Sequence, residues 1–171
     1  MRADLESQAR VDWIRDVMQQ YEARLLRYAQ RITKDLERAR DVVQETFLRL
    51  CKQDPAELDG HLSEWLYTVC RNRALDVQKK ERRMATMTEV DAVHAFTEAS
   101  PADEVETRDT AQHVFGLLDA LPDNQQEVVR LKFEGGLSYR AISEVTGLSV
   151  SNVGYLLHQA IRTLRQRAQT T

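Results

Sequence analysis

The sequence predicts an all-α fold, and two observations support this prediction. Only 6 Gly and 3 Pro occur among the 171 residues, whereas a β-sandwich or barrel would show turn signals roughly every 8 to 12 residues. In several long stretches, apolar side chains recur at steps of three and four residues, which is the period of one buried helix face. The hydrophobic fraction of 42% can form a core, and the charged fraction of 30% leaves a strongly charged surface.

The first half of the chain predicts three amphipathic helices. The first covers residues 11–31, with its apolar face formed by Ile14, Val17, Met18, Tyr21, Leu25 and Tyr28. Asp35 is suited to cap a second helix, which is expected to end near residues 51–53. Ser63 is expected to cap a third helix, whose far end is basic and faces solvent.

The second half of the chain predicts a helix-turn-helix. A short helix capped by Ser138, a positive-φ turn at Gly147 and a longer helix capped by Ser149 follow one another. An ordinary helical hairpin within a bundle is the alternative. It would explain the apolar stripe of the two helices but not the polar face at the start of the second one. We therefore expect this second helix to enter a major groove of DNA.

Charge is distributed unevenly along the chain. Residues 1–83 contain 17 Lys and Arg against 15 Asp and Glu, and residues 111–171 contain six against five. Residues 84–110 contain one against seven, a net charge of −6, and show little apolar periodicity. They are therefore expected to form an acidic flexible linker between two small helical domains.

The sequence shows no pattern of a metal site, a cofactor site or catalytic residues. Cys51 and Cys70 are far apart and have no Cys or His neighbours at ligand spacing. A Gly-rich phosphate loop and a nucleophile–base arrangement are also missing, so we expect neither an enzyme nor a small-molecule substrate. An apolar leader and a membrane-spanning stretch are not recognisable either, so the expected location is the cytoplasm, without insertion into a membrane.

Two blocks of sequence resemble the regions shared by bacterial sigma factors. ARDVVQETFLRL followed by WLYTVCRNRALDVQKKERR resembles the second conserved region. LPDNQQEVVRLKFEGGLSYRAISEVTGLSVSNVGYLLHQAIRTLRQR resembles the fourth. Because only these two regions occur, in this order and joined by a short tether, the chain resembles the extracytoplasmic-function (ECF) type of sigma factor.

The resemblance implies a role for each part of the chain. Residues 1–83 would bind core RNA polymerase and the minus-ten promoter element, residues 84–110 would be the linker, and residues 111–171 would bind the minus-thirty-five element. In the family, the helix that matches residues 41–47 docks on the polymerase. The implied core-binding residues are Asp41, Gln44, Glu45 and Leu48. A solvated charged helix face is the alternative for this set.

The helix that matches residues 65–83 melts and reads the minus-ten element in the family. The implied DNA contacts are Arg71, Asn72, Arg73, Asp76, Lys79 and Lys80. Cationic side chains neutralise the phosphates of melted DNA, and Asn or Arg can bond to its bases. A structural hydrogen-bonding role is an equally open reading for Asp76. The loop at residues 52–60 matches the segment that holds a base flipped out of the promoter, but it has no aromatic side chain for stacking.

The helix-turn-helix would read the minus-thirty-five element. The implied contacts are Arg140, Ser149, Ser151, Asn152, Tyr155, His158, Gln159 and Arg162. Many members of the family carry Lys and Arg where this chain has Gly154 and Leu156. A glycine within a helix costs up to about 1 kcal/mol relative to alanine, so we expect Gly154 to allow close packing or a close approach to DNA or polymerase.

The partners that the resemblance implies are core RNA polymerase, promoter DNA and an anti-sigma factor. A stand-alone helix-turn-helix regulator of transcription is the alternative function. It would leave residues 41–50 and the basic third helix without a role. A helical adaptor that binds no DNA is a further, less economical reading.

Overall fold

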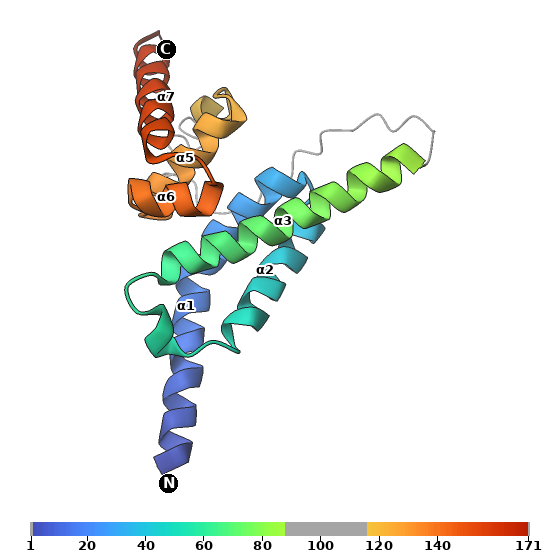
Figure 1. Cartoon of the computed structure of the whole chain (residues 1–171), viewed down its shortest axis with the longest axis vertical. Helices are drawn as coiled ribbons and strands as arrows, with labels where there is room; N and C mark the ends of the chain where they lie inside the picture. Colours follow the sequence, from blue (N-terminus) through green and yellow to red (C-terminus); the bar gives the residue numbers. More distant parts are fainter. Residues whose placement is uncertain (1, 88–115, 171) are drawn as a thin grey trace, which may run out of the picture.

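The computed structural model describes residues 2–87 and 116–170, and within these ranges all regular elements are helices (Figure 1). The first range contains α1 (Arg2–Thr33), α2 (Leu36–Leu50), the short 3-10 helix η1 (Pro55–Leu58) and α3 (Leu62–Met87). The second contains α5 (Asp123–Phe133), α6 (Tyr139–Thr146) and α7 (Val150–Thr170), and residues 116–119 are also helical. The prediction of an all-α fold is confirmed.

The helices of the first range pack on one another around an apolar core. α1 contacts both α2 and α3, and α2 contacts α3. The largest side chains of this core are fully buried: Tyr28, Tyr67, Leu25, Leu50 and Leu66. α1 begins nine residues before the expected start at residue 11, and α3 continues to Met87. Residues 84–87 of the expected linker are therefore helical, and its residues 88–110 lie outside the described residues.

Two of the expected helix caps in this half have different outcomes. The Asp35 side chain accepts a hydrogen bond of 2.8 Å from the backbone N–H of Arg38, which confirms it as the cap of α2. The prediction for Ser63 is wrong, because α3 already begins at Leu62. The Ser63 hydroxyl instead donates a hydrogen bond of 2.7 Å to the carbonyl of Gly135, at the end of α5.

The helices of the second range form a smaller core, and its turns follow the predicted pattern. α5 packs on α7, and α6 packs on both. The Ser138 hydroxyl accepts a hydrogen bond from the Ala141 N–H at 3.1 Å, and the Ser149 hydroxyl accepts one from the Asn152 N–H at 3.2 Å. Between the two helices, Gly147 has a φ of 75°, in the left-handed region that favours glycine. The helix-turn-helix is therefore present as predicted.

Gly154 lies inside this motif, where α7 passes the ring of Tyr139. A Cβ atom at this position would lie 3.5 Å from the ring, which is ordinary van der Waals contact. We therefore predict that Gly154→Ala raises the free energy of unfolding by up to about 1 kcal/mol, because alanine has the higher helix propensity. Urea unfolding followed by circular dichroism measures this change.

Gly147→Ala is the matched control for this prediction. The same replacement in the same motif should lower the free energy of unfolding by about 1 kcal/mol or more, because the left-handed backbone at Gly147 strains any residue with a Cβ. A loss of stability in Gly154→Ala would instead show that α7 packs too closely at this position to accommodate a methyl group.

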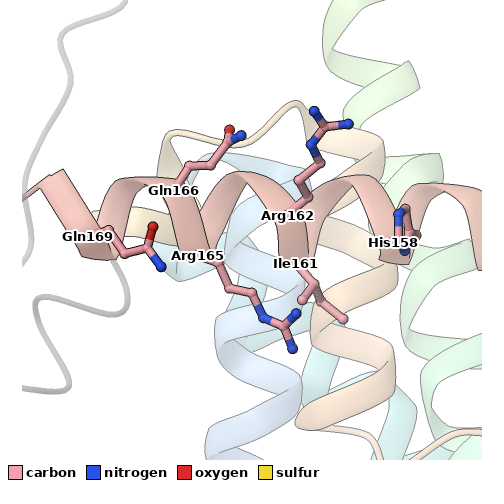
Figure 2. Close-up of a pocket in the computed structure, with 6 residues that line it drawn as sticks. All are labelled: His158, Ile161, Arg162, Arg165, Gln166 and Gln169. Atoms are coloured by element: carbon pink, nitrogen blue, oxygen red, sulfur yellow. The ribbon is translucent and has the colours of Figure 1, made fainter.

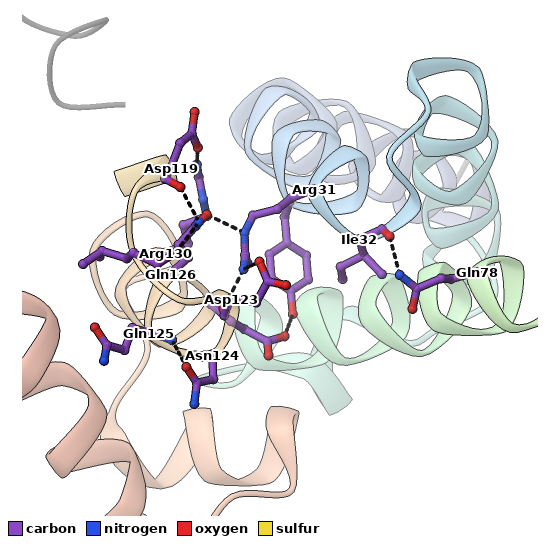
Figure 3. Close-up of polar contacts among 12 residues, drawn as sticks. Arg31, Ile32, Gln78, Asp119, Asp123, Asn124, Gln125, Gln126 and Arg130 are labelled. Atoms are coloured by element: carbon purple, nitrogen blue, oxygen red, sulfur yellow. Dashed lines mark hydrogen bonds and ion pairs between the residues drawn. The ribbon is translucent and has the colours of Figure 1, made fainter. Parts of the chain in front are cut away.

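The two helical units touch each other through α1 and α3 on one side and α5 and α6 on the other (Figure 1). Figure 3 shows Arg31 of α1 reaching the start of α5. The turn after α5 also approaches α3 closely, since a Cβ at Gly135 would lie 3.0 Å from the ring of Tyr67. The two helical units are therefore in direct contact in the structure.

Candidate functional site

An open groove runs between α1 and α2. Its floor and rim are largely apolar, with a few polar and charged groups at the edges. The lining residues are Met18, Glu22, Leu26, Arg40, Val43, Gln44, Phe47, Leu48 and Cys51. Leu48 is 59% exposed and Met18 is 37% exposed, although both are large apolar residues. A partner that covers this groove would remove these apolar side chains from water.

The four residues predicted to bind core polymerase lie in different places relative to this groove. Gln44 and Leu48 line it. Asp41 is exposed about two turns before Leu48 on the same helix. Glu45 points elsewhere, because its carboxylate pairs with Arg49 at 2.8 Å and with Arg73 of α3 at 2.5 Å. Glu45 therefore links α2 to α3 in the structure.

Sequence patterns did not indicate that α1 contributes to the groove. Met18 was expected on the buried face of α1, and Glu22 and Leu26 were assigned no role. All three line the groove. The signal that could have revealed them is the position of Met18 at the edge of the apolar stripe, four residues before Glu22 and eight before Leu26, which places all three on one side of the helix.

The predicted minus-ten residues of α3 fall into two groups. Asn72, Asp76, Lys79 and Lys80 are all exposed, and their spacing places them on one side of the helix. Arg71 and Arg73 are half-buried and engaged in ion pairs. Arg73 binds Glu45, and Arg71 binds Glu127 of α5 at 2.8 Å. The exposed group forms a continuous polar face, whereas the two arginines are held by carboxylates.

The loop at residues 52–60 is held in place at both of its ends. Arg10 of α1 donates hydrogen bonds of 2.7 and 2.9 Å to the carbonyls of Cys51 and Gln53. The Asp54 side chain caps η1 by accepting from the Ala56 N–H at 2.9 Å, and Leu58 is buried. The loop is therefore a defined structure next to the start of α3, although no aromatic side chain lies in it.

The predicted minus-thirty-five residues lie on one side of the helix-turn-helix. Ser149, Ser151, Asn152, Tyr155, His158 and Arg162 are exposed, as is Arg140 on α6, and Gln159 is partly buried. Tyr155 is 61% exposed. The opposite side of α7 carries the buried residues Val153, Leu156, Leu157 and Ala160. The side chains that could reach DNA are thus separate from those that hold the helix.

Farther along α7 a shallow depression continues the exposed face. Figure 2 shows its lining residues, His158, Ile161, Arg162, Arg165, Gln166 and Gln169, all on this one helix. Arg162 and Arg165 give it a positive charge. A second cationic surface therefore follows the polar start of the helix, as expected for a surface next to phosphates.

Burial controls the titration of three groups in the interior of the protein. Burial raises the pKa of the Cys70 thiol from its ordinary 9.0 to about 12, although a hydrogen bond with Thr46 opposes the shift. Burial raises the pKa of Tyr28 well above its ordinary value, and the nearby Glu127 carboxylate adds to the increase. The pKa of Tyr67 is also raised, first by burial and then by the charge of Glu134. All three groups are therefore neutral at pH 7.

These shifts predict that the protein loses stability at alkaline pH. The pKa of each group is higher in the folded than in the unfolded protein. Its contribution to the free energy of unfolding is therefore complete below pH 9 and is lost as the pH rises, first for Cys70 and then for the two tyrosines. Above the ordinary pKa, each group lowers the free energy of unfolding by about 1.4 kcal/mol per pH unit. Urea unfolding at a series of pH values from 8 upward measures this loss. In Cys70→Ala the loss should begin near the ordinary tyrosine pKa of 10.0. A stability that stays constant above pH 9 in the unmodified protein would contradict the prediction.

Neither a metal cluster nor a membrane-spanning helix is found in the part of the chain that the structure describes. Residues 2–87 and 116–170 contain no group of three or more His, Cys, Asp or Glu side chains that could hold a metal ion. Across these same ranges, no helix combines the length and the apolar character needed to cross a membrane.

Comparison with known proteins assigns both helical units. The family description Sigma-70 region 2 matches residues 17–84, and Sigma-70, region 4 matches residues 114–164. The ECF RNA polymerase sigma factor SigL of Mycobacterium tuberculosis (strain ATCC 25618 / H37Rv) is 31% identical over 160 residues, which cover 91% of this chain and 89% of the relative. The chain belongs to the ECF family of RNA polymerase sigma factors.

Other relatives of this sigma factor agree with the assignment. The ECF RNA polymerase sigma factor SigM of Bacillus subtilis (strain 168) is 29% identical over 154 residues, covering 89% of this chain and 93% of the relative. Among solved structures, the sigma factor RpoE in complex with the anti-sigma factor NepR from Bartonella quintana has a TM-score of 0.66 at 21% identity. The match covers 92% of this chain and 97% of the other, and shows a shared fold.

Each of the three exposed surfaces described above lies within one of the two matched sigma-70 regions. The groove and the exposed face of α3 lie within the region 2 match, and the exposed face of α7 lies within the region 4 match. The contact between Arg71 and Glu127 joins the two regions, and no sequence motif indicated it.

Proposed function

We propose that this sigma factor directs core RNA polymerase to specific promoters and starts transcription by recognising and melting promoter DNA. The observation that carries the proposal is the presence of both sigma-70 regions in one chain, each with a solvent-exposed polar helix face. Catalysis belongs to the polymerase in this account, and the chain itself is not an enzyme. Because polymerase and chromosome are cytoplasmic in bacteria, we place the protein in the cytoplasm.

Each surface has a distinct part in the proposed function. The groove between α1 and α2 receives core polymerase, with Leu48 and Gln44 inside the contact and Asp41 at its rim. Glu45 contributes by fixing α2 against α3 through Arg73. Residues 1–83 would thus form the part that binds polymerase and the minus-ten element, and residues 111–171 the part that binds the minus-thirty-five element. Residues 84–110 would be the linker, of which residues 84–87 continue α3.

On α3, Asn72, Asp76, Lys79 and Lys80 would face the melted minus-ten strand, where lysines neutralise phosphates and Asn72 bonds to bases. Arg71 and Arg73 join them when their ion pairs open. On the helix-turn-helix, Asn152 and Tyr155 would read base edges, while Arg140 and Arg162 hold phosphates.

An anti-sigma factor is a further proposed partner. A solved structure of the same fold, the sigma factor RpoE with NepR, is a complex with an anti-sigma factor. A second one contains CnrH in complex with the cytosolic domain of CnrY. The CnrH match has a TM-score of 0.58 at 20% identity and covers 96% of this chain. The exposed apolar side chains of the groove are a surface that such a partner could cover in place of polymerase.

A change in the salt dependence of promoter binding tests the role of α3. Lys80→Ala should weaken binding of the reconstituted holoenzyme to promoter DNA and lower the slope of log K against log salt by about one, because one phosphate contact is lost. Filter binding at a series of KCl concentrations measures both quantities.

Arg15→Ala is the control, because Arg15 is an exposed cation on α1 that pairs with Asp12 and lies outside the proposed DNA surface. Its slope should equal that of the unmodified protein. Equal slopes of log K against log salt for Lys80→Ala and the unmodified protein would show that Lys80 does not contact a DNA phosphate.

A further inference from the structure

The loop between α2 and α3 is tied to α1 by one arginine. Nη2 of Arg10 donates hydrogen bonds of 2.7 Å to the carbonyl of Cys51 and of 2.9 Å to the carbonyl of Gln53. These bonds join residues 41 and 43 positions apart in the sequence, where the loop passes beside α1 (Figure 1). A terminal guanidinium nitrogen carries two hydrogens, so this single atom can serve both carbonyls.

The two carbonyls lie where α2 ends, at Leu50. The last carbonyls of a helix have no partner within it, and the negative end of the helix dipole favours a cation at this place. A charged donor also forms a stronger hydrogen bond than a neutral one. Arg10 is therefore well suited to hold the chain as it leaves α2 and enters the loop.

The far part of the loop is held by contacts that do not involve Arg10. The Asp54 side chain caps η1, and Leu58 is only 3% exposed. The backbone N–H of His61 bonds to the carbonyl of Leu58 at 3.1 Å, just before α3 begins. Loss of the Arg10 side chain is therefore expected to release the chain at residues 51–53 and to leave α2 and α3 folded.

The position of the loop backbone matters because the loop offers no ring on which a base could stack. Its exposed residues are Lys52, Asp54, Ala56, Glu57, Asp59 and Gly60. A base placed here has to be recognised by hydrogen bonds to backbone groups and polar side chains. Such bonds weaken steeply as the distance and angle depart from their best values. Discrimination between bases therefore depends on where the loop backbone is held.

The loop also lies close to the proposed DNA surface of α3. Asn72, on the exposed face of this helix, comes ten residues after its first residue, Leu62, which is about 15 Å along the axis. At about 3.4 Å per nucleotide, about four to five nucleotides of one strand cover that length. A strand on the exposed face of α3 therefore extends to the loop within a single promoter element.

We propose that Arg10 is a positioning residue for the recognition of one base of the minus-ten element. Arg10 does not touch this base. It holds the carbonyls of Cys51 and Gln53 and thereby fixes the backbone of residues 52–60, which meets the base. The inference rests on the proposed function, because only a chain that binds the minus-ten element has a base to place on this loop.

Hydrogen–deuterium exchange in the free protein tests whether Arg10 holds the loop. The backbone N–H groups of Lys52 and Gln53 bond to the carbonyls of Arg49 and Leu50, so their exchange reports opening of this turn. Arg10→Met keeps a long side chain but removes its donors, and should speed exchange at residues 51–53 by at least about tenfold. Peptides from α3 should exchange as in the unmodified protein, which verifies the fold.

Sequencing of promoter fragments that holoenzyme selects from a pool with a randomised minus-ten element tests the role in recognition. One mismatched base pair typically weakens specific binding by a factor of about five to about 150. Arg10→Met should reduce this factor to below about three at one position and retain it at the others. Arg10→Lys keeps a cationic donor on a slightly shorter side chain and should restore part of the preference.

Arg15→Met is the matched control, because Arg15 is an exposed cation of the same helix that pairs with Asp12 and does not reach the loop. Both its exchange and its base preferences should equal those of the unmodified protein. Unchanged exchange in Arg10→Met would overturn the proposal that Arg10 holds the loop. Faster exchange with every base preference retained, even at lower overall affinity, would reduce Arg10 to a structural cap of α2 and overturn its role in recognition.

The two measurements also separate this inference from the proposed function. Failure of the unmodified protein to support transcription with core polymerase would overturn the proposed function, and the role in base recognition with it. The exchange result would still stand in that case, because it is measured on the free protein. Loss of one base preference in Arg10→Met, with partial recovery in Arg10→Lys, would support both.

Discussion

A Leu48→Glu variant is expected to lose binding to core RNA polymerase by at least about thirtyfold, which corresponds to about 2 kcal/mol. Leu48 is 59% exposed in the free protein and lines the groove between α1 and α2. In the complex, its side chain would be buried against the partner, and a glutamate would place an unpaired charge there. Competition binding with fluorescently labelled core polymerase measures the loss.

Val11→Glu provides the matched control. Val11 is also an exposed apolar residue, at 47%, and does not line the groove. Both substitutions should change the free energy of unfolding by less than about 0.5 kcal/mol, because neither side chain is buried in the free protein. Similar affinities for Leu48→Glu and Val11→Glu would show that the groove is not where polymerase binds.

Replacement of Asn152 by alanine should relax promoter specificity at one base pair. Asn152 lies in the first turn of α7, on its exposed face, and a side-chain amide can form two hydrogen bonds to adenine in the major groove. Loss of such a pair costs about 1–3 kcal/mol at that base and leaves the remaining positions unchanged. Sequencing of promoter fragments selected by holoenzyme with and without the substitution measures the effect at each position.

Gln169→Ala is the control on the same helix, since Gln169 is exposed far from the first turn of α7. The preferences selected with it should match those of the unmodified protein at every position. A uniform loss of affinity in Asn152→Ala, with all base preferences retained, would assign Asn152 to a phosphate contact rather than to reading a base.

The helices and their caps could be predicted well because their signals are local. Asp35, Ser138 and Gly147 act within one or two turns of their own positions, so residue type alone identifies them. The cap assigned to Ser63 failed because its hydroxyl bonds to Gly135, 72 residues away. A tertiary contact of this kind leaves no periodic trace in the sequence.

The exposed residues of the candidate site could be predicted where they lie on one face of a single helix. Asn152, Tyr155, Lys79 and Lys80 are exposed as their spacing suggested. The ion pair of Arg71 was not foreseeable, because Glu127 looks like any charged residue of a short helix. Its importance comes from the packing of α5 against α1 and α3, which depends on how the two units meet.

Run-off transcription tests the central claim most directly. Purified core RNA polymerase is incubated with and without the protein on a pool of genomic promoter fragments, and the transcripts are mapped. The account predicts new start sites that depend on the protein and share two spaced elements. If core polymerase bound the protein but no start site appeared with any fragment, or if the protein bound DNA specifically only without polymerase, the assignment of its function would be contradicted.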